Sequence, residues 1–245
     1  MDRAYFYSMM NGEGTLDYEL YLNSKKLLSC QKDFKDFCNQ DELQFQIVHQ
    51  VEELWMKLIA YTLLDIDEYI QQENTNRVIT LFRRVHLAEK LMIDQLSLLE
   101  TMSPKEYQEI RLNLGRGSGQ ESPGFRTLLK MHQPLWQSFK THYLDKYHLT
   151  VDKIYNSEYA HSDAYVVAEA LAEFDELFQR FRFHHLQLIQ RTIGLGAKSL
   201  KGRSVELLNE GLQTRFFPEL WESRNKMTDE WGAQYGVVRD SLGGP

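Results

Sequence analysis

The sequence predicts an all-α protein, because apolar residues recur with the 3.6-residue period of a helix along most of the chain. The long segments lack the period-2 alternation of half-buried strands, and only 5 prolines interrupt them. Hydrophobic residues make up 42% and charged residues 26%, which is typical of a folded globular chain and not of a disordered one. We therefore expect one helical domain extending over residues 1–245.

The periodic segments locate the helices along the chain. We expect helices over residues 14–38, 41–72, 75–101, 104–114, 123–147, 163–194 and 203–215. Residues 148–162 have no clear period and are expected to form a connecting loop. Because no long repeat and no low-complexity segment occurs, the sequence does not predict a repeat array.

The net charge of -7 argues against nucleic acid or an anionic membrane as a partner, because both repel an acidic protein. No apolar run reaches the roughly 18 residues that a membrane-spanning helix needs. The start at Met1 lacks the basic and then apolar pattern of a signal peptide, so we expect a cytoplasmic protein. Cys30 and Cys38 are then expected to be reduced thiols, and two cysteines alone cannot form a structural zinc site.

The segment 163–194 carries a histidine pair on an apolar stripe. At 100° per residue, the stripe consists of Val167, Phe174, Phe178, Phe181 and Leu188. His185 falls at its centre and His184 about a quarter-turn away. A buried imidazole needs partners for its ring nitrogens. A single histidine on an apolar face is more often a core residue than a metal ligand, so the pattern alone leaves both interpretations open.

The segment 41–72 is apolar on two faces. One face carries Ile47, Val51, Leu54, Trp55 and Leu58, and the opposite face carries Phe45, His49 and Met56. A helix with two apolar faces is usually an interior helix, so His49 is expected to point into the protein. The other five histidines do not lie on an apolar helix face and are expected at the surface or in loops. They are His86, His132, His142, His148 and His161.

Four stretches of the chain, in order, carry a more specific pattern. They are Tyr18-Glu19-Leu20-Tyr21-Leu22 with the following Leu27-Leu28-Ser29-Cys30-Gln31; the helix from Asp41 to Lys57 (DELQFQIVHQVEELWMK); Leu99-Glu100-Thr101-Met102 through Tyr107, Arg111, Ser118-Gly119 and Phe125-Arg126; and Arg182-Phe183-His184-His185 through Phe216-Phe217-Pro218-Glu219-Leu220-Trp221. Each resembles a motif of the tryptophan 2,3-dioxygenase family, and the resemblance runs from about residue 14 to residue 221. The second stretch is the most specific, because its many fixed positions rarely coincide by chance.

The resemblance implies a helical bundle that encloses a haem pocket. His185 would be the ligand of the iron in haem b (iron protoporphyrin IX), which agrees with its place on the apolar stripe and leaves the sixth position for dioxygen. Ser118 and Gly119 would also contact the cofactor. His49 would be the catalytic residue that hydrogen-bonds the indole N–H, and Phe45 would pack against the indole ring.

Tyr107 and Arg111 share one face of the segment 104–114. A guanidinium beside a phenol is well suited to binding an amino-acid carboxylate. Residues four apart on an exposed helix face can also form a weak contact of no functional importance, so the spacing alone leaves both interpretations open. The resemblance favours the carboxylate site. It also implies that Tyr18 and Tyr21 reach the substrate pocket of a neighbouring subunit in a homotetramer, a dimer of dimers with exchanged N-terminal segments.

The chain departs from the family pattern after the histidine helix. Where the family has the glycine-rich loop G-T-G-G-S-S-G, this chain has Lys198-Ser199-Leu200-Lys201-Gly202-Arg203-Ser204. Ser199 would replace the threonine that contacts the substrate ammonium, but without the flanking glycines and their conformational freedom. The lid is therefore expected to have a different shape.

The resemblance and this departure leave three functions open. The first is insertion of dioxygen into the indole C2–C3 bond of L-tryptophan or a close derivative, giving an N-formylkynurenine-type product as in tryptophan catabolism. The second is haem-dependent mono-oxygenation of an aromatic amino acid in natural-product biosynthesis. The third is a haem-binding or interaction protein without catalysis, against which the joint presence of His49, Tyr107 and Arg111 argues.

Overall fold

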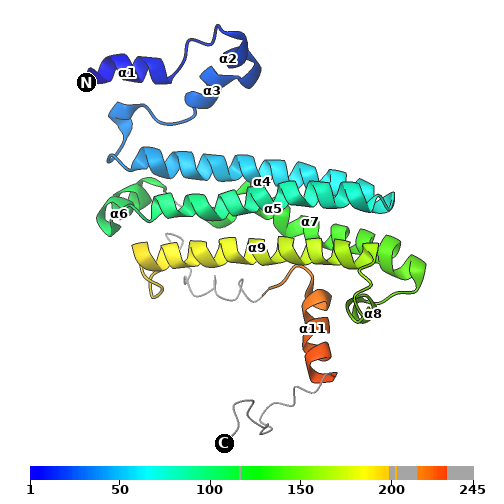
Figure 1. The fold of residues 1–245 in the computed structure, drawn as a ribbon. Helices are drawn as coiled ribbons and strands as arrows, with labels where there is room; N and C mark the ends of the chain where they lie inside the picture. The colour runs from blue at the N-terminus through cyan, green and yellow to red at the C-terminus, as the bar shows by residue number, and fades with distance from the viewer. Residues whose placement is uncertain (116, 199–201, 203–213, 231–245) are drawn as a thin grey trace, which may run out of the picture.

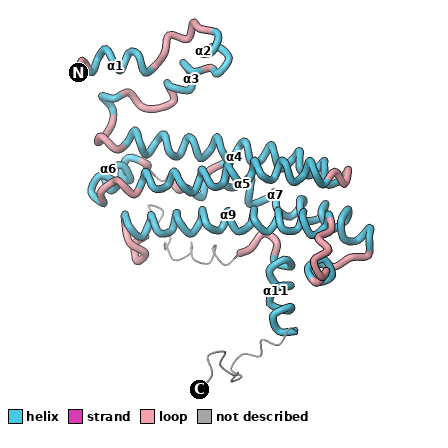
Figure 2. Tube along the Cα trace, in the orientation of Figure 1, coloured by secondary structure: helices cyan, strands magenta, loops and turns pink. Residues whose placement is uncertain are grey.

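The computed structural model describes residues 1–115, 117–198, 202 and 214–230. Its long helices lie side by side and form a bundle (Figures 1 and 2): α4 (Glu42–Gln71), α5 (Thr75–Leu99), α7 (Pro123–Phe139) and α9 (Asp163–Thr192). No β-strand occurs in these ranges, and none of their helices is long and apolar enough to cross a membrane. The prediction of an all-α fold is confirmed.

The core forms where the apolar stripes of these helices meet. The stripe predicted for α9 is confirmed, since Val167 and Phe174 are 0% exposed and Phe178 is 1% exposed. α4 contributes Ile59, Leu63, Ile66 and Ile70, and α5 contributes Leu81, Val85, Met92 and Leu96. Burial of these side chains provides the main stabilisation of the bundle, because isolated helices of this kind are marginal in water.

The first half of α4 differs from the expectation. The stripe that contains Ile47, Leu54 and Leu58 is exposed in this chain, at 42%, 49% and 39%, whereas Val48 and Met56 are buried. The prediction that both faces of this helix lie in the interior of the chain is therefore wrong. Period alone identifies an apolar face but not the element that covers it.

The prediction of one helix over 14–38 is also wrong. The segment forms α2 (Asp17–Leu22), α3 (Ser24–Leu28) and the 3₁₀ turn η1 (Phe34–Asp36). Asn23, at φ 53°, adopts the left-handed conformation and ends α2, a conformation that asparagine tolerates better than most residues. None of these short elements buries a side chain, so no tertiary packing is available to support a longer helix.

The remaining elements are short. α6 (Pro104–Asn113) matches its prediction, and α7 continues through the π turn η3 (Lys140–Leu144) and the 3₁₀ turn η4 (Asp145–Tyr147) to the predicted end of that segment. The predicted loop 148–162 contains α8 (Val151–Tyr155), which Thr150 caps. α1 (Arg3–Met10) and α11 (Pro218–Glu230) were not predicted. Most of the helix predicted over 203–215 lies outside the described residues.

An aspartate in the core attaches the C-terminal elements to the bundle. Asp175 is 0% exposed, and its Oδ2 accepts hydrogen bonds from Phe216 N at 3.0 Å, Phe217 N at 3.3 Å and Trp221 Nε1 at 2.7 Å. These bonds offset the cost of burying its carboxylate. They fix the start of α11, which projects away from the bundle in Figure 1.

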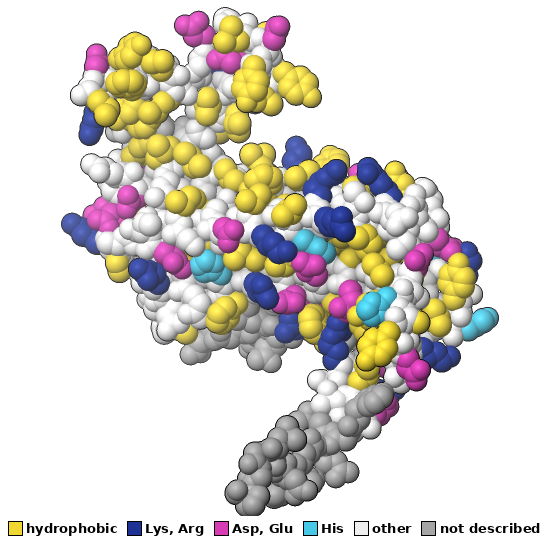
Figure 3. Space-filling view, in the orientation of Figure 1, with side chains coloured by type: hydrophobic (Ala, Val, Ile, Leu, Met, Phe, Trp, Pro, Cys, Tyr) yellow, Lys and Arg dark blue, Asp and Glu magenta, His cyan; other side chains and the backbone are white. Residues whose placement is uncertain are grey.

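The N-terminal segment lies along one side of the bundle and exposes many apolar side chains. Figure 3 shows them as yellow patches over α1 to α3. The most exposed include Leu16 at 67%, Tyr18 at 74%, Leu20 at 61% and Tyr21 at 90%. An apolar surface of this kind marks an interaction site in a folded protein.

Candidate active site

His185, at the centre of the α9 stripe, is the first residue of the site. The residue is partly buried, and no described residue hydrogen-bonds its ring. Desolvation, followed by the charges of His49 and His184, lowers the pKa of His185 to about 4. The ring is therefore neutral at ordinary pH and keeps a lone pair, which is the form that ligates a metal.

The immediate surroundings of His185 are an aromatic ring and a glycine. The Phe181 ring lies one turn earlier in α9, with 6.5 Å between ring centroids. Gly119, at the start of the 3₁₀ turn η2 (Gly119–Glu121), lies beside the imidazole, because a Cβ there would be 4.0 Å from both Cε1 and Nε2 of His185. Ser118 caps this turn by accepting from Gln120 N at 3.4 Å. The ring thus faces backbone and not a bulky side chain at this edge.

His49 is the second half-buried histidine of the site. Its Nδ1 lies 2.7 Å from the carbonyl oxygen of Phe45, so Nδ1 carries the proton and donates it. The other ring nitrogen, Nε2, is then an acceptor. Burial lowers the pKa of His49 below its usual value, which keeps the ring neutral. A hydrogen-bond acceptor is therefore available at this position.

Aromatic rings surround the His49 imidazole. The ring of Phe45 is 4.1 Å from that of His49 and 6.3 Å from that of Tyr107, which comes from α6. Burial raises the pKa of Tyr107 above its usual value, so its phenol keeps the O–H donor. The structure thus brings three of the predicted residues, Phe45, His49 and Tyr107, into one aromatic wall.

Arg111 follows Tyr107 by one turn of α6, as predicted. Its Nη1 donates to Gln108 Oε1 at 3.3 Å and its Nη2 to the carbonyl oxygen of Lys198 at 2.6 Å. The second bond joins α6 to the segment after α9, where the sequence departs from the family pattern. Neither partner is a carboxylate, so the positive charge of the guanidinium is not neutralised by an ion pair within the described residues.

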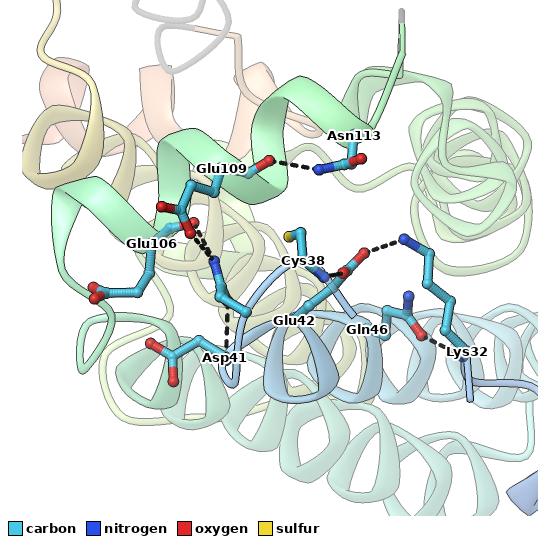
Figure 4. Close-up of polar contacts among 9 residues, drawn as sticks. Lys32, Cys38, Asp41, Glu42, Gln46, Glu106, Glu109 and Asn113 are labelled. Atoms are coloured by element: carbon cyan, nitrogen blue, oxygen red, sulfur yellow. Dashed lines mark hydrogen bonds and ion pairs between the residues drawn. The ribbon is translucent and has the colours of Figure 1, made fainter. Parts of the chain in front are cut away.

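Local contacts fix α6 relative to α4. Ser103 and Glu106 form a capping box at the start of α6. Asn39 Nδ2, just before α4, donates to the Glu106 carbonyl oxygen and to Glu109 Oε2, both at 3.0 Å. Figure 4 shows this arrangement beside Glu42, which accepts from Cys38 N at 2.7 Å and pairs with Lys32. Because these contacts join the chain entering α4 to α6, the aromatic wall is held from both sides.

Two predicted residues do not join this site. Tyr18 and Tyr21 lie on α2, outside the bundle, and remain exposed in the chain (Figure 1). Ser199 lies outside the described residues. The prediction that His86 is a surface or loop residue is wrong: it is 6% exposed, and its Nε2 lies 3.0 Å from the Ala170 carbonyl oxygen. This histidine has the satisfied environment of a core residue.

Two cavities lie away from His49 and His185. A groove of about 550 Å³ runs between α5, α9 and α11, and one of about 490 Å³ lies around η3, α8 and α11. Charged side chains in the first groove pair with each other, as Lys90 does with Glu173 at 3.0 Å and Arg224 with Glu169 at 2.6 Å. These satisfied ion pairs are typical of a solvated surface, so we assign the chemistry to the site at His49 and His185.

Sequence reasoning missed a pair of contacts next to this site. His184 Nε2 lies 2.9 Å from Glu100 Oε1, and Gln44 Nε2 donates to the Leu98 carbonyl oxygen at 2.8 Å. The signal for the first contact was the motif Leu99-Glu100-Thr101-Met102, but spacing along the chain assigns no role to its glutamate.

The described residues form an all-helical bundle, in which the neutral rings of His49 and His185 lie close enough to interact and Tyr107 packs near Phe45. The sequence model described as tryptophan 2,3-dioxygenase matches residues 7–153. The chain belongs to the tryptophan 2,3-dioxygenase family, and the predicted membership of a dioxygenase family is confirmed.

Several relatives match over most of their length. A tryptophan 2,3-dioxygenase of Myxococcus xanthus is 30% identical, with 88% of this chain and 91% of that protein covered. Those of Serratia proteamaculans and Bacillus thuringiensis subsp. konkukian are 26% and 28% identical, each with 86% of this chain and 93% of the relative covered. The resemblance therefore extends well beyond the residues 7–153 matched by the family model.

Proposed function

We propose that this chain is a haem-dependent dioxygenase that inserts both oxygen atoms of dioxygen into the indole C2–C3 bond of L-tryptophan or a close derivative. The observation that carries the proposal is the neutral His185 ring, which has no hydrogen-bond partner among the described residues and stands near His49. Family membership and the names of the relatives support it. Residues 1–245 would act as one oxygenase domain, with an N-formylkynurenine-type product.

The residues around His185 fit haem b. A neutral imidazole with a free lone pair ligates iron, and the absence of a side chain at Gly119 leaves space beside the ring. Ser118 lies at the same edge and would approach the cofactor. When bound, haem supplies the dioxygen site and the redox chemistry, while the protein supplies position and hydrogen bonds.

His49 and Phe45 would hold the indole. The Nε2 of His49 accepts the indole N–H, because Nδ1 is already committed to the Phe45 carbonyl oxygen. The ring of Phe45 packs on one side of the indole and excludes water. Fixing the indole within about 3–3.5 Å of its reaction partner is a large source of rate, and no strong base is required at His49.

Arg111 and Tyr107 would hold the amino-acid end of the substrate. The guanidinium has five donors, so two can bind a carboxylate while another keeps the bond to the Lys198 carbonyl oxygen. The neutral phenol of Tyr107 adds a donor on the same helix face. Ser199, which follows Lys198 in sequence, would contact the substrate ammonium.

The N-terminal segment would complete the pocket of a neighbouring subunit in a homotetramer. Its support is the exposed apolar surface of α2, with Tyr18 and Tyr21 among the most exposed side chains. Burying such a surface between subunits is favourable by roughly 25 cal/mol per Å². Light scattering of the purified protein tests the assembly, and a monomer at micromolar concentration would contradict it.

Oxygen labelling tests the reaction. The haem-loaded protein is mixed with L-tryptophan under ¹⁸O₂, and the product is weighed by mass spectrometry. We expect a product with two labelled atoms per turnover. A hydroxylated product with one labelled atom would instead support mono-oxygenation, the alternative that the departure from the family pattern at Lys198–Ser204 leaves open. Haem binding without any product from tryptophan or its analogues would contradict both.

A further inference from the structure

The turn between α5 and α6 contacts the first histidine of the α9 pair, His184. Glu100 Oε1 accepts a hydrogen bond from Nε2 of His184 at 2.9 Å, and the two side chains are 35% and 24% exposed. His184 directly precedes His185. The bond therefore fixes the helix turn that presents the proposed iron ligand, and its partial burial makes it stronger than a fully solvated pair.

The same turn contacts α4 on its other side. The Gln44 amide nitrogen donates to the Leu98 carbonyl oxygen at 2.8 Å and to Thr101 Oγ1 at 3.2 Å. Gln44 directly precedes Phe45 and lies about one turn before His49. The segment 98–101 is thus hydrogen-bonded both to His184, which precedes the proposed iron ligand, and to Gln44, which precedes the aromatic residue Phe45.

The turn is itself well anchored. Leu99 is 1% and Met102 is 4% exposed, and both belong to the core. Backbone hydrogen bonds close it, from Thr101 N to Leu98 O at 3.1 Å and from Met102 N to Leu99 O at 3.2 Å. A turn held in this way can transmit a fixed spacing between the two helices that it touches.

We propose that Glu100 and Thr101 are positioning residues that set the separation and orientation of the His185 side and the His49 side of the site. Glu100 acts through His184 and orients the His185 imidazole toward the iron. Thr101 acts through Gln44 and holds the Phe45 and His49 face. The inference rests on the proposed function only in that His185 binds haem. Partners behind a ligand commonly tune its affinity and geometry.

The test for Glu100 uses the ferrous haem protein. Glu100→Ala removes the acceptor, Glu100→Gln keeps one, and Glu176→Ala breaks the exposed ion pair with Arg180 on α9 as a control. We measure the iron–histidine stretching frequency by resonance Raman spectroscopy and the rate of haem transfer to apomyoglobin. We expect Glu100→Ala to shift the frequency and to lose haem about tenfold faster or more, as loss of one such hydrogen bond predicts.

The controls separate the possible failures. Glu100→Gln and Glu176→Ala should resemble the wild type. His184→Ala removes the same bond from the other partner, so it substitutes for Glu100→Ala if that variant does not fold. If both Glu100→Ala and His184→Ala kept the wild-type stretching frequency and the wild-type rate of haem loss, the inference would be overturned. If His185→Gly also retained haem normally, the proposed haem site itself would be wrong.

The test for Thr101 examines the substrate side. Thr101→Val keeps the shape and removes the hydroxyl, whereas Thr101→Ser keeps the hydroxyl. We expect Thr101→Val to raise the KM for the aromatic amino acid several-fold while leaving the iron–histidine frequency unchanged, and Thr101→Ser to stay near the wild type. An unchanged KM, or equal effects of the two substitutions, would contradict the role assigned to Thr101.

Discussion

The His49 imidazole donates its Nδ1 proton to the backbone carbonyl of Phe45, with 2.7 Å between nitrogen and oxygen. This bond fixes the tautomer and turns Nε2 into an acceptor. A substrate N–H is the natural partner of such an acceptor, which explains why a neutral histidine suits this position better than a charged one.

His49→Ala is expected to lower kcat/KM for L-tryptophan about tenfold to hundredfold, because the indole loses a hydrogen bond and its orientation. The matched probe is 1-methyl-tryptophan, which has no indole N–H to donate. With this substrate the wild type and His49→Ala should have similar kcat/KM values. An equally large difference with both substrates would mean that His49 does not bind the indole nitrogen.

Arg111→Ala is expected to weaken binding of L-tryptophan about tenfold to hundredfold, since a charge-assisted bond to the carboxylate is lost. The visible spectrum of the haem protein should stay the same. Tryptamine, which lacks the carboxylate, serves as the control ligand and should bind the wild type and the variant alike. If L-tryptophan bound both proteins equally, the carboxylate would be held elsewhere.

Glu52→Gln is expected to stabilise the protein at alkaline pH. Desolvation, with a further contribution from the charge of Glu53, raises the pKa of the buried Glu52 to about 8. Between its unfolded pKa, near 4.5, and about 8, the folded state holds a proton that the unfolded state has lost. The stability that Glu52 contributes is thus fully present at low pH and decreases as pH rises through this range.

A neutral glutamine removes this loss. The free energy of unfolding is measured with urea at pH 5 and at pH 8 for Glu52→Gln and the wild type. The difference in favour of Glu52→Gln should grow with pH, by up to about 1.4 kcal/mol per pH unit. Glu68→Gln, at an exposed position of the same helix, is the control. A constant difference at the two pH values would mean that Glu52 is ionised in the folded protein.

Gly124→Ala is expected to destabilise the bundle by about 1–3 kcal/mol, because α4 and α7 approach too closely for a methyl group. A Cβ at Gly124 would lie 2.7 Å from Met56 Cβ and 2.9 Å from Glu53 Oε2. Gly196→Ala is the control, since nothing lies within 4 Å of its added Cβ. Thermal unfolding of the two variants makes the comparison, and equal stabilities would contradict the close approach.

The sequence predicted those parts of the fold that depend on local periodicity. The apolar stripe of α9 follows from burial at a helical period, and the structure agrees for Val167, Phe174 and Phe178. The prediction of one helix over residues 14–38 failed, because Asn23 adopts a left-handed conformation within a continuous apolar pattern. The exposed Ile47 and Leu54 on α4 show that an apolar face does not identify its partner.

The site was predicted in part. The i,i+4 pairs Phe45 with His49 and Tyr107 with Arg111 could be placed, because one helix fixes each pair. The bond between Glu100 and His184 joins residues far apart in the chain, so no local pattern reveals it. The contact between Arg111 and the Lys198 carbonyl oxygen was missed for the same reason.

The central claim is that the His185 imidazole binds haem iron, and haem titration of the apoprotein tests it most directly. The wild type should take up one haem per chain with a Soret band, His185→Gly should not retain it, and added imidazole should restore the band by filling the vacated space. Equal haem uptake and an identical spectrum in His185→Gly without imidazole would contradict the assignment.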